Sequence, residues 1–392
     1  MDKTWAYKKI GDVCIVERGG SPRPIDKYIT DSPDGINWIK IGDTTDSMFI
    51  TNTAQKIKPE GMSKSRYVQP GDFLLSNSMS FGRPYILKID GCIHDGWLVL
   101  RDDQGAFDKR FLYYYLSSPS TYRKFKEMAV GGVVNNLNSE MVRNVLVPVP
   151  SKEEQEVIVS VLEKIDRLIS LRKQQLAKLD ELIKARFVEM FGDPVINPKR
   201  YPIIPISDLF DVGSSKRVFE SEWRASGVPF YRAREIVKLS KDGYVNNELF
   251  IENDLYEKYK SKYGVPRAGD MMVTGVGTLG VCYIVQPHDR FYFKDGNTLW
   301  FRNKGKCNVR FIMEQYNMEF VRRQIEANAN VSTVGTYTIT NANNTLVLVP
   351  SIEEQNTFDY FVSQVDKSKA GVQQSLDKLE TLKNALMQQY FG

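Results

Sequence analysis

Residues 147–192 read VPVPSKEEQEVIVSVLEKIDRLISLRKQQLAKLDELIKARFVEMFG, and this stretch decides the fold because the chain contains it twice. Residues 347–392 read VLVPSIEEQNTFDYFVSQVDKSKAGVQQSLDKLETLKNALMQQYFG and align with it without a gap, at an offset of 200. Sixteen of the 46 aligned positions are identical. Because self-similarity at a fixed offset indicates a repeated structural unit, the sequence predicts a duplication.

Each copy predicts one long helix. Ser151 with Glu154, and Ser351 with Glu354, form the capping-box pattern that starts a helix. Neither stretch contains an interior proline. About 40 residues at ~1.5 Å each give a helix of ~60 Å.

Apolar residues recur along both helices at alternating steps of four and three, which is typical of a coiled-coil seam. Arg172, Lys369 and Lys383 interrupt this seam. An alternative is that each helix packs only on its own domain, but the shared phase of the two copies favours antiparallel pairing about a pseudo-twofold axis. The predicted seam residues are Ile158, Leu162, Ile165, Ile169, Leu176, Leu179, Ile183, Phe358, Val362, Val365, Val372, Leu376 and Leu379.

The repeat extends weakly upstream of the helices. GDFLLSNSMSFG at 71–82 matches GDMMVTGVGTLG at 269–280, and Asp95-Gly96 recurs as Asp295-Gly296. Short apolar runs after the Gly-Asp turns predict strands, and helical spacing follows in each copy. The ranges are 73–76, 85–89, 271–274 and 281–285 for strands, and 111–128 and 311–327 for helices. We therefore predict an α+β chain with domains at 1–150 and 194–350 and helices at 151–193 and 351–392.

Composition restricts the function only weakly. A formal net charge of +5 permits nucleic-acid binding without requiring it. The four cysteines form no CxxC pair and the chain has two histidines, so we expect no metal site and a reducing compartment. The N-terminus has no apolar core of a secretion signal and no run reaches the ~20 residues of a membrane span, which predicts a soluble, cytoplasmic protein.

Two copies of this pattern resemble the specificity subunits of type I restriction-modification systems. The resemblance covers essentially the whole chain. It rests on Pro148–Gln155 and its variant Val349–Gln355, on the KLD and KLE segments at 178–180 and 378–380, and on the Gly-Asp turns of both domains.

The resemblance implies two target-recognition domains, each reading one half of a bipartite, asymmetric DNA sequence. It implies that the paired helices set the spacer and dock two methyltransferase subunits, and that ATP-driven nuclease/translocase subunits join this complex. S-adenosylmethionine, ATP and Mg are then expected on those partners, with no cofactor in this chain. The sequence opens directly into its first domain, which leaves open how the second helix meets the partner near the N-terminus.

The family's base contacts vary between members, so the DNA-binding residues are predicted from chemistry. Base edges are read by Asn, Arg, Lys, Ser or Thr on loops, and phosphates are bound by Arg, Lys and backbone amides. The first domain offers Ser21, Arg23, Lys40, Lys64, Arg66, Ser76, Asn77, Ser78, Ser80, Arg83, Asn135 and Asn136. The second offers Lys216, Arg217, Arg232, Arg234, Lys260, Lys262, Thr274, Thr278 and Tyr337.

Motifs for catalysis are weak or missing. Residues 275–280 fit GxGxxG, but a strand rather than a helix is predicted next, which disfavours a dinucleotide site. We find no phosphate-binding GK[ST] loop, NPPY-like methyltransferase motif or marked nuclease cluster, so the chain is expected to be non-catalytic. A coiled-coil scaffold without DNA readout and a stand-alone DNA-modifying enzyme are the alternatives, separable by salt-dependent DNA binding and by activity without added subunits.

Overall fold

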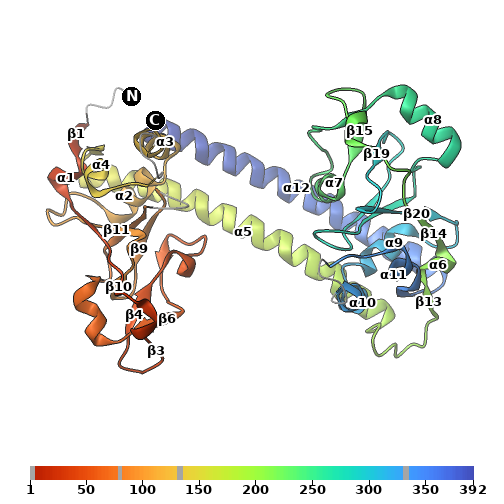
Figure 1. The fold of residues 1–392 in the computed structure, drawn as a ribbon, viewed down its shortest axis with the longest axis horizontal. Coiled ribbons are helices and arrows are strands. Elements are labelled where there is room, and N and C mark those ends of the chain that lie inside the picture. Colours follow the sequence, from red (N-terminus) through yellow and green to blue (C-terminus); the bar gives the residue numbers. More distant parts are fainter. Residues whose placement is uncertain (1–4, 78–81, 130–135, 330–334) are drawn as a thin grey trace. The chain divides into compact units, whose positions relative to one another are not determined.

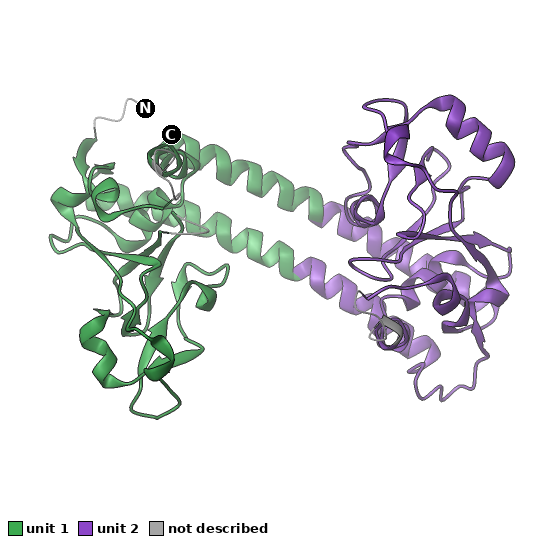
Figure 2. Ribbon diagram, viewed as in Figure 1, with its two compact units in different colours: residues 1–174, 373–392 green, residues 175–372 purple. Residues whose placement is uncertain are grey.

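The structure is a computed structural model that describes residues 5–77, 82–129, 136–329 and 335–392. It divides into two compact units. Unit 1 combines residues 1–174 with residues 373–392, and unit 2 comprises residues 175–372 (Figure 2). The end of the chain is therefore part of the first unit.

Unit 1 contains three sheets (Figure 1). Its strands are β1 (Ala6–Lys9), β2 (Ile15–Arg18), β3 (Ile29–Thr30), β4 (Ile36–Ile39), β5 (Phe49–Ile50), β6 (Gln55–Ile57), β7 (Arg66–Val68), β8 (Phe73–Ser76), β9 (Pro84–Leu87), β10 (Gly91–Ile93), β11 (Trp97–Arg101) and β12 (Leu146–Val149). The core sheet has the order β2-β11-β8-β9-β5, and the second sheet has the order β3-β6-β4-β10-β7. β1 pairs with β12 in a small third sheet.

Helices of unit 1 bury one face of its core sheet. They are α1 (Ile10–Val13), α2 (Lys109–Leu116), α3 (Pro119–Ala129), α4 (Ser139–Arg143) and the first part of α5 (Lys152–Phe191). Leu98 and Leu100 of β11 lie in one buried cluster with Phe111 and with Ile158 of α5. Alternate residues of the same strand, such as Val99, face a separate cluster with the second sheet.

Unit 2 repeats this arrangement with fewer strands. They are β13 (Ile203–Pro205), β14 (Phe210–Gly213), β15 (Val228–Tyr231), β16 (Phe250–Ile251), β17 (Met271–Thr274), β18 (Cys282–Ile284), β19 (Tyr292–Phe293), β20 (Thr298–Asn303) and β21 (Leu346–Leu348). The core sheet has the order β14-β20-β17-β18, the second sheet has the order β16-β15-β19, and β13 pairs with β21. The helices are α6 (Ile206–Leu209), α7 (Ala233–Asp242), α8 (Asn253–Tyr263), α9 (Val309–Gln315), α10 (Glu319–Ala329), α11 (Ile339–Asn344), the end of α5 from residue 175, and α12 (Ile352–Phe391) up to residue 372.

Both long helices contribute to the core of each unit. In unit 1, Met387 and Phe391 of α12 join Ile158 and Leu162 of α5 in the buried cluster. The Phe391 ring lies 5.5 Å from that of Phe111, centroid to centroid. In unit 2 the contributions are exchanged, because Phe187 and Phe191 of α5 join Phe358 and Val362 of α12.

Each cation that interrupts the seam forms a hydrogen bond or an ion pair with the other long helix. In unit 1, Lys383 Nζ lies 2.6 Å from Asp166 Oδ1, and Arg172 Nε donates to Ser375 Oγ at 3.2 Å. In unit 2, Lys369 Nζ lies 2.6 Å from Asp180 Oδ1. Within unit 1, a later residue of α5 meets an earlier residue of α12, so the helices pair antiparallel.

The predicted fold class, α+β with two similar domains and two long antiparallel helices, is confirmed. All thirteen predicted seam residues are buried or half-buried. Packing of each helix on its own domain alone is wrong, because each core contains both helices. The pseudo-twofold relation between the domains stays a prediction.

Local elements follow the sequence closely. Both capping boxes form, with Ser151 N and Ser351 N donating to the carboxylates of Glu154 and Glu354. The predicted single helix at 111–128 is instead α2 followed by α3, because Pro119 cannot continue the hydrogen bonding of the preceding helix. The stretch at 311–327 is likewise divided between α9 and α10.

No helix among the described residues combines the length and the apolar character needed to cross a membrane.

We expect Phe187→Ala to lower the free energy of unfolding by about 3–5 kcal/mol, because it leaves a cavity in the core of unit 2. Phe187 is fully buried, and its ring centroid lies 5.0, 5.6 and 5.5 Å from those of Phe191, Phe311 and Phe358. Val188→Ala is the matched control, since Val188 is 48% exposed and its truncation should change the free energy by less than about 0.5 kcal/mol. Urea unfolding followed by tryptophan fluorescence measures both, and equal losses would contradict this packing.

Candidate nucleic-acid interface

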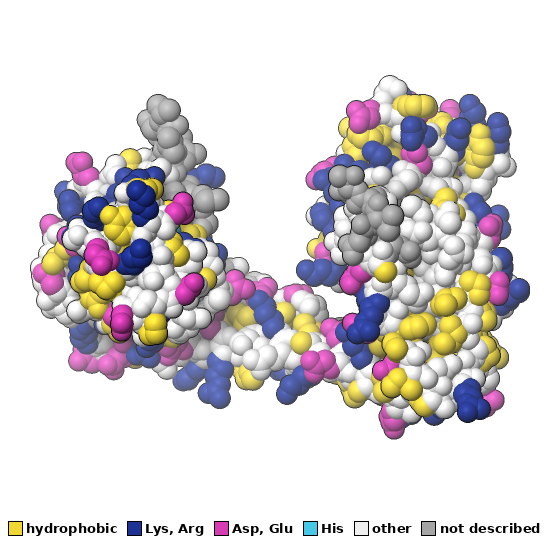
Figure 3. All heavy atoms as spheres, turned by 60° about the horizontal axis from the view of Figure 1, so that its bottom comes forward, with side chains coloured by type: hydrophobic (Ala, Val, Ile, Leu, Met, Phe, Trp, Pro, Cys, Tyr) yellow, Lys and Arg dark blue, Asp and Glu magenta, His cyan; other side chains and the backbone are white. Residues whose placement is uncertain are grey.

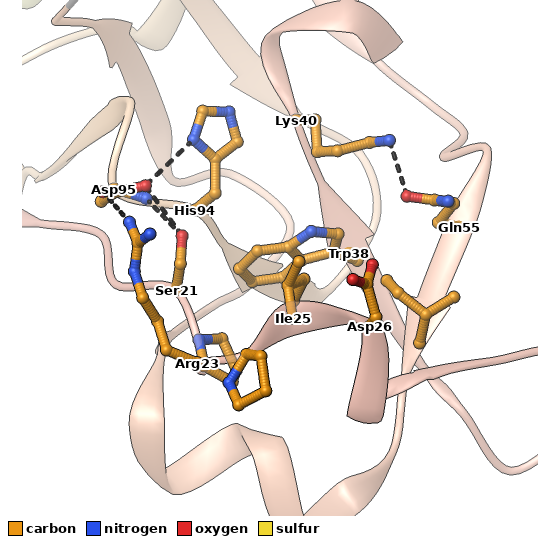
Figure 4. A pocket seen from close by; sticks show the side chains of 12 residues that line it. Ser21, Arg23, Ile25, Asp26, Trp38, Lys40, Gln55, His94 and Asp95 are labelled. Atoms are coloured by element: carbon orange, nitrogen blue, oxygen red, sulfur yellow. Dashed lines mark hydrogen bonds and ion pairs between the residues drawn. The ribbon is translucent and has the colours of Figure 1, made fainter.

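Three residues predicted to bind DNA converge on one pocket of unit 1. Ser21, Arg23 and Lys40 line a cavity of about 680 Å³, with Trp38 and His94 among the other lining residues (Figure 4). β4 and β10 run parallel, and the chain leaves their carboxyl ends as Lys40 and as His94-Asp95. In open sheets, ligands usually bind at the carboxyl ends of parallel strands, where polar side chains gather.

Asp95 is the centre of the bonding in this pocket. Ser21 Oγ donates to Asp95 Oδ1 at 2.8 Å, and Arg23 Nη2 lies 3.3 Å from Asp95 Oδ2. The hydrogen bond from Ser21 is the main cause that lowers the pKa of the Asp95 carboxyl, and the charge of Arg23 acts in the same direction. The carboxylate therefore stays ionised at neutral pH beside an arginine that is 79% exposed.

Lys40 lies across the pocket from Asp95, whereas His94 lies beside Asp95, with Nδ1 3.8 Å from Oδ1 (Figure 4). Lys40 Nζ donates to Gln55 Oε1 at 2.7 Å. The backbone nitrogens of Ile41 and Gly96 lie 3.1 Å from Nε2 and 2.7 Å from Nδ1 of His94, and a neutral ring accepts a hydrogen bond from one of the two. Burial is the main cause that lowers the pKa of His94, so the ring is neutral at pH 7.

The last residue of β8 and the first residue of the loop that follows it have buried side chains. Ser76 is 1% and Asn77 is 2% exposed. Ser76 Oγ accepts from the amide of Arg83, and Asn77 Nδ2 donates to the carbonyl of Asp95 at 2.9 Å. In this conformation these two side chains are not available to a DNA base, and Asn77 fastens the start of the loop to the Asp95-Gly96 turn.

The other predictions in unit 1 are partly paired. Lys64 donates to the hydroxyl of Tyr28, and Arg66 lies 3.2 Å from Glu17. Arg83 is exposed and Asn136 is half-buried. Ser78, Ser80 and Asn135 lie outside the described residues.

In unit 2, Arg217 repeats the pairing of Arg23. Arg217 Nε lies 2.9 Å from Asp295 Oδ2, and the guanidinium side chain is 66% exposed. The neighbouring Lys216 has an exposed side chain, and its amide donates to the hydroxyl of Tyr292 at 3.0 Å. An arginine–aspartate pair thus occurs at the Asp-Gly turn of each unit.

Arg232 and Arg234 are bonded to a buried acid. Arg232 follows β15 as Lys40 follows β4, and its guanidinium lies 2.9 Å from Glu235. Arg234 Nε donates to the same carboxylate at 2.6 Å and also pairs with Glu248. Burial alone would raise the pKa of Glu235, but the hydrogen bonds from the two arginines outweigh it and lower that pKa.

The remaining predictions in unit 2 differ in exposure. Lys260 and Lys262 are exposed on α8, and Thr278 is exposed in the turn after β17. Thr274 is fully buried, and its hydroxyl donates to the carbonyl of Thr278. Tyr337 is 1% exposed and its hydroxyl is bonded to those of Tyr316 and Thr345, so it has a structural role in this conformation.

Sequence reasoning found Ser21, Arg23 and Lys40 but missed the aspartates and the other residues that line the pocket. Asp95 and Asp295 were visible as a recurring Asp-Gly pair, but an acidic side chain is not an obvious DNA ligand. Trp38 and His94 had no local signal. The surface charge does not mark a DNA-binding face either, because Lys and Arg are interspersed with Asp and Glu on the faces shown in Figure 3.

The structure shows neither a dinucleotide-binding motif at residues 275–280 nor a metal-binding cluster among the described residues. The GxGxxG stretch is followed by β18, so the predicted strand is confirmed and the dinucleotide-binding context is missing. Among the described residues, no three His, Cys, Asp or Glu side chains are grouped in a way that can hold a metal ion.

Comparisons with known proteins agree with the resemblance found in the sequence. Residues 2–181 match the family described as the type I restriction modification DNA specificity domain. A Haemophilus influenzae protein named for a type I restriction enzyme specificity subunit is 26% identical over 71% of this chain and 66% of its own length. The MjaIX specificity subunit of Methanocaldococcus jannaschii is 24% identical over 67% of this chain and 65% of its own length. Each alignment covers just under two thirds of the relative's own length.

Solved structures share the fold. A chain from a type I restriction-modification system, solved to explain complex assembly and conformational transition, covers 99% of this chain and 97% of its own, with a TM-score of 0.59 and 15% identity. A type I S subunit from M. genitalium covers 100% of this chain and 97% of its own, with a TM-score of 0.54 and 14% identity. The predicted resemblance is confirmed.

We predict that Glu235→Gln destabilises unit 2 by about 1–3 kcal/mol near pH 7, since it removes the charged partner of two arginines. The folded-state pKa of Glu235 lies below the ordinary value of 4.5, so its contribution is present above that pH and is lost as the pH falls through the folded-state pKa. Urea unfolding midpoints between about pH 7 and pH 3 should therefore converge for the two proteins at the acidic end. A constant difference would contradict the ionised-carboxylate assignment.

Proposed function

We propose that this chain, which carries the type I restriction modification DNA specificity domain and resembles type I specificity subunits, is the DNA-reading subunit of such a system. Each unit reads one half of a bipartite, asymmetric target. The observation that carries this proposal is the repeated site, in which an exposed arginine is held at the Asp-Gly turn of both units. The surrounding residues differ between the units, so the two half-sites differ as well.

The long helices set the distance between the half-sites. Each helix is 40 residues long, and each contributes buried side chains to both units. A paired helix is stiff along its axis, so the number of residues in it determines the spacing of the domains it joins. The same helices dock two methyltransferase subunits, and nuclease and translocase subunits join that complex.

In this proposal the partner subunits carry out methylation and cleavage of the DNA. The chain contributes recognition and assembly, and catalysis is left to the partner subunits. S-adenosylmethionine, ATP and Mg are carried by the methyltransferase subunits and the nuclease/translocase subunits. The protein acts in the cytoplasm, where its DNA target is accessible.

Binding to DNA separates this function from that of a protein scaffold. The complex with methyltransferase subunits should bind a target duplex sequence-selectively, and its affinity should fall with rising salt because phosphate contacts release counterions. Fluorescence anisotropy over about 50–200 mM salt measures both properties, with the methyltransferase subunits alone as the control. A complex that binds target duplex no better than those subunits alone would support the scaffold alternative.

Lengthening both helices should lengthen the spacer. Four residues inserted after Gln174 and after Gln374 add ~6 Å to each helix, which corresponds to about two base pairs. We expect both half-sites to stay the same while the unspecified stretch between them grows, as read by sequencing of methylated sites.

The matched control inserts the same four residues after Ile196, which is 75% exposed in the turn between α5 and β13. That insertion should leave the spacer unchanged. Altered half-sites after the helix insertions would refute the role of the helices as a ruler.

A further inference from the structure

We propose that Arg23 and Arg217 each read a guanine in one half of the target, and that Asp95 and Asp295 are the positioning residues that orient them. The inference rests on the proposed function and deepens it, because it names the residues and the base that they recognise. It differs from a general phosphate contact, which carries no sequence information.

The pair occupies corresponding places in the two units. Arg23 lies in the loop after β2, and Arg217 lies in the loop after β14. β2 and β14 are edge strands of the core sheets and pair with β11 and β20. The aspartates belong to the Asp-Gly turns that precede β11 and β20. The two loops differ in sequence, so no shared local motif produces the arginine–aspartate pair. The pair forms in both units because the same two connections of the core sheet lie next to each other.

Both arginines remain exposed although they are paired. The Arg23 side chain is 79% and the Arg217 side chain 66% exposed. Arg23 meets its aspartate through Nη2, and Arg217 meets its aspartate through Nε. Each contact uses one edge of the guanidinium, so another edge of the fork faces solvent. Arg232, by contrast, is 23% exposed and turned toward Glu235.

The aspartate determines which DNA group the paired arginine can bind. A carboxylate beside the guanidinium offsets its charge and repels a phosphate, so the pair is poorly suited to the DNA backbone. The remaining N–H groups still match O6 and N7 of guanine, which are neutral acceptors in the major groove. The carboxylate can accept from the amino group of the paired cytosine. The geometry therefore favours a guanine–cytosine pair.

The Asp95 side chain and both Asp-Gly turns are held by further hydrogen bonds. Ser21 Oγ donates to the carboxylate of Asp95, and Asn77 Nδ2 and Arg18 Nε donate to its carbonyl at 2.9 and 3.1 Å. In unit 2, the amide of Gly296 donates to Ser214 Oγ at 3.3 Å. A side chain held before binding loses less conformational freedom on binding, which is the advantage of such a supporting bond.

Lysine substitutions test the readout, because lysine keeps the charge but lacks the guanidinium fork. The full chain is expressed with its methyltransferase subunits in a bacterial host, and methylated adenines are mapped by sequencing. Arg23→Lys should make one guanine position of one half-site degenerate, and Arg217→Lys should do the same in the other half-site. Discrimination at that position should fall by about ten- to a hundredfold.

Arg323→Lys is the matched control. Arg323 is 67% exposed and its Nε lies 2.6 Å from Glu319 on α10, so it is an exposed arginine–carboxylate pair away from the Asp-Gly turn. Both half-sites should be unchanged in this variant. Asp95→Asn should relax the same base position as Arg23→Lys, which a purely structural role of Asp95 would not do.

Uniformly slower methylation with unchanged half-sites in Arg23→Lys and Arg217→Lys would overturn the inference in favour of phosphate contacts. Half-sites without a guanine–cytosine pair in the unmodified complex would overturn it too, while leaving the proposed function intact. An unmodified complex without a two-part target would instead overturn the proposed function, and this inference with it.

Discussion

Antiparallel packing of two long helices is the interaction on which the rest of the structure depends. Neither globular core is complete with one helix, because Ile158 shares a cluster with Phe391 and Phe187 shares one with Phe358. Burial of such aromatic side chains is among the largest single contributions to a core. The end of the chain must therefore return to the first unit before that unit is fully packed.

The same packing explains the polar residues in the helix seam. Lys383 and Lys369 reach Asp166 and Asp180 on the other helix, so each charge is paired where it enters the interface. Partly exposed pairs of this kind add little stability, but an incorrect register would leave the charges unpaired. The polar pairs therefore favour one register of the two helices over others.

Sequence reasoning succeeded wherever a signal was local or periodic. The capping boxes, the seam positions and the strands β8 and β17 follow from neighbouring residues, and all are present in the structure. It failed where distant segments meet. Arg23 and Asp95 lie 72 residues apart, and no local pattern shows that they pair. The burial of Tyr337 likewise depends on α9 and on the strand that follows α11, which the loop sequence does not contain.

The most direct test of the account is the DNA target of the unmodified complex, mapped from methylated adenines in a genome that expresses this chain with its methyltransferase subunits. Two recognition units predict two short, different specific sequences, separated by a run of fixed length in which any base is accepted. A continuous or palindromic target would contradict the account, because it would require one reader or two identical ones.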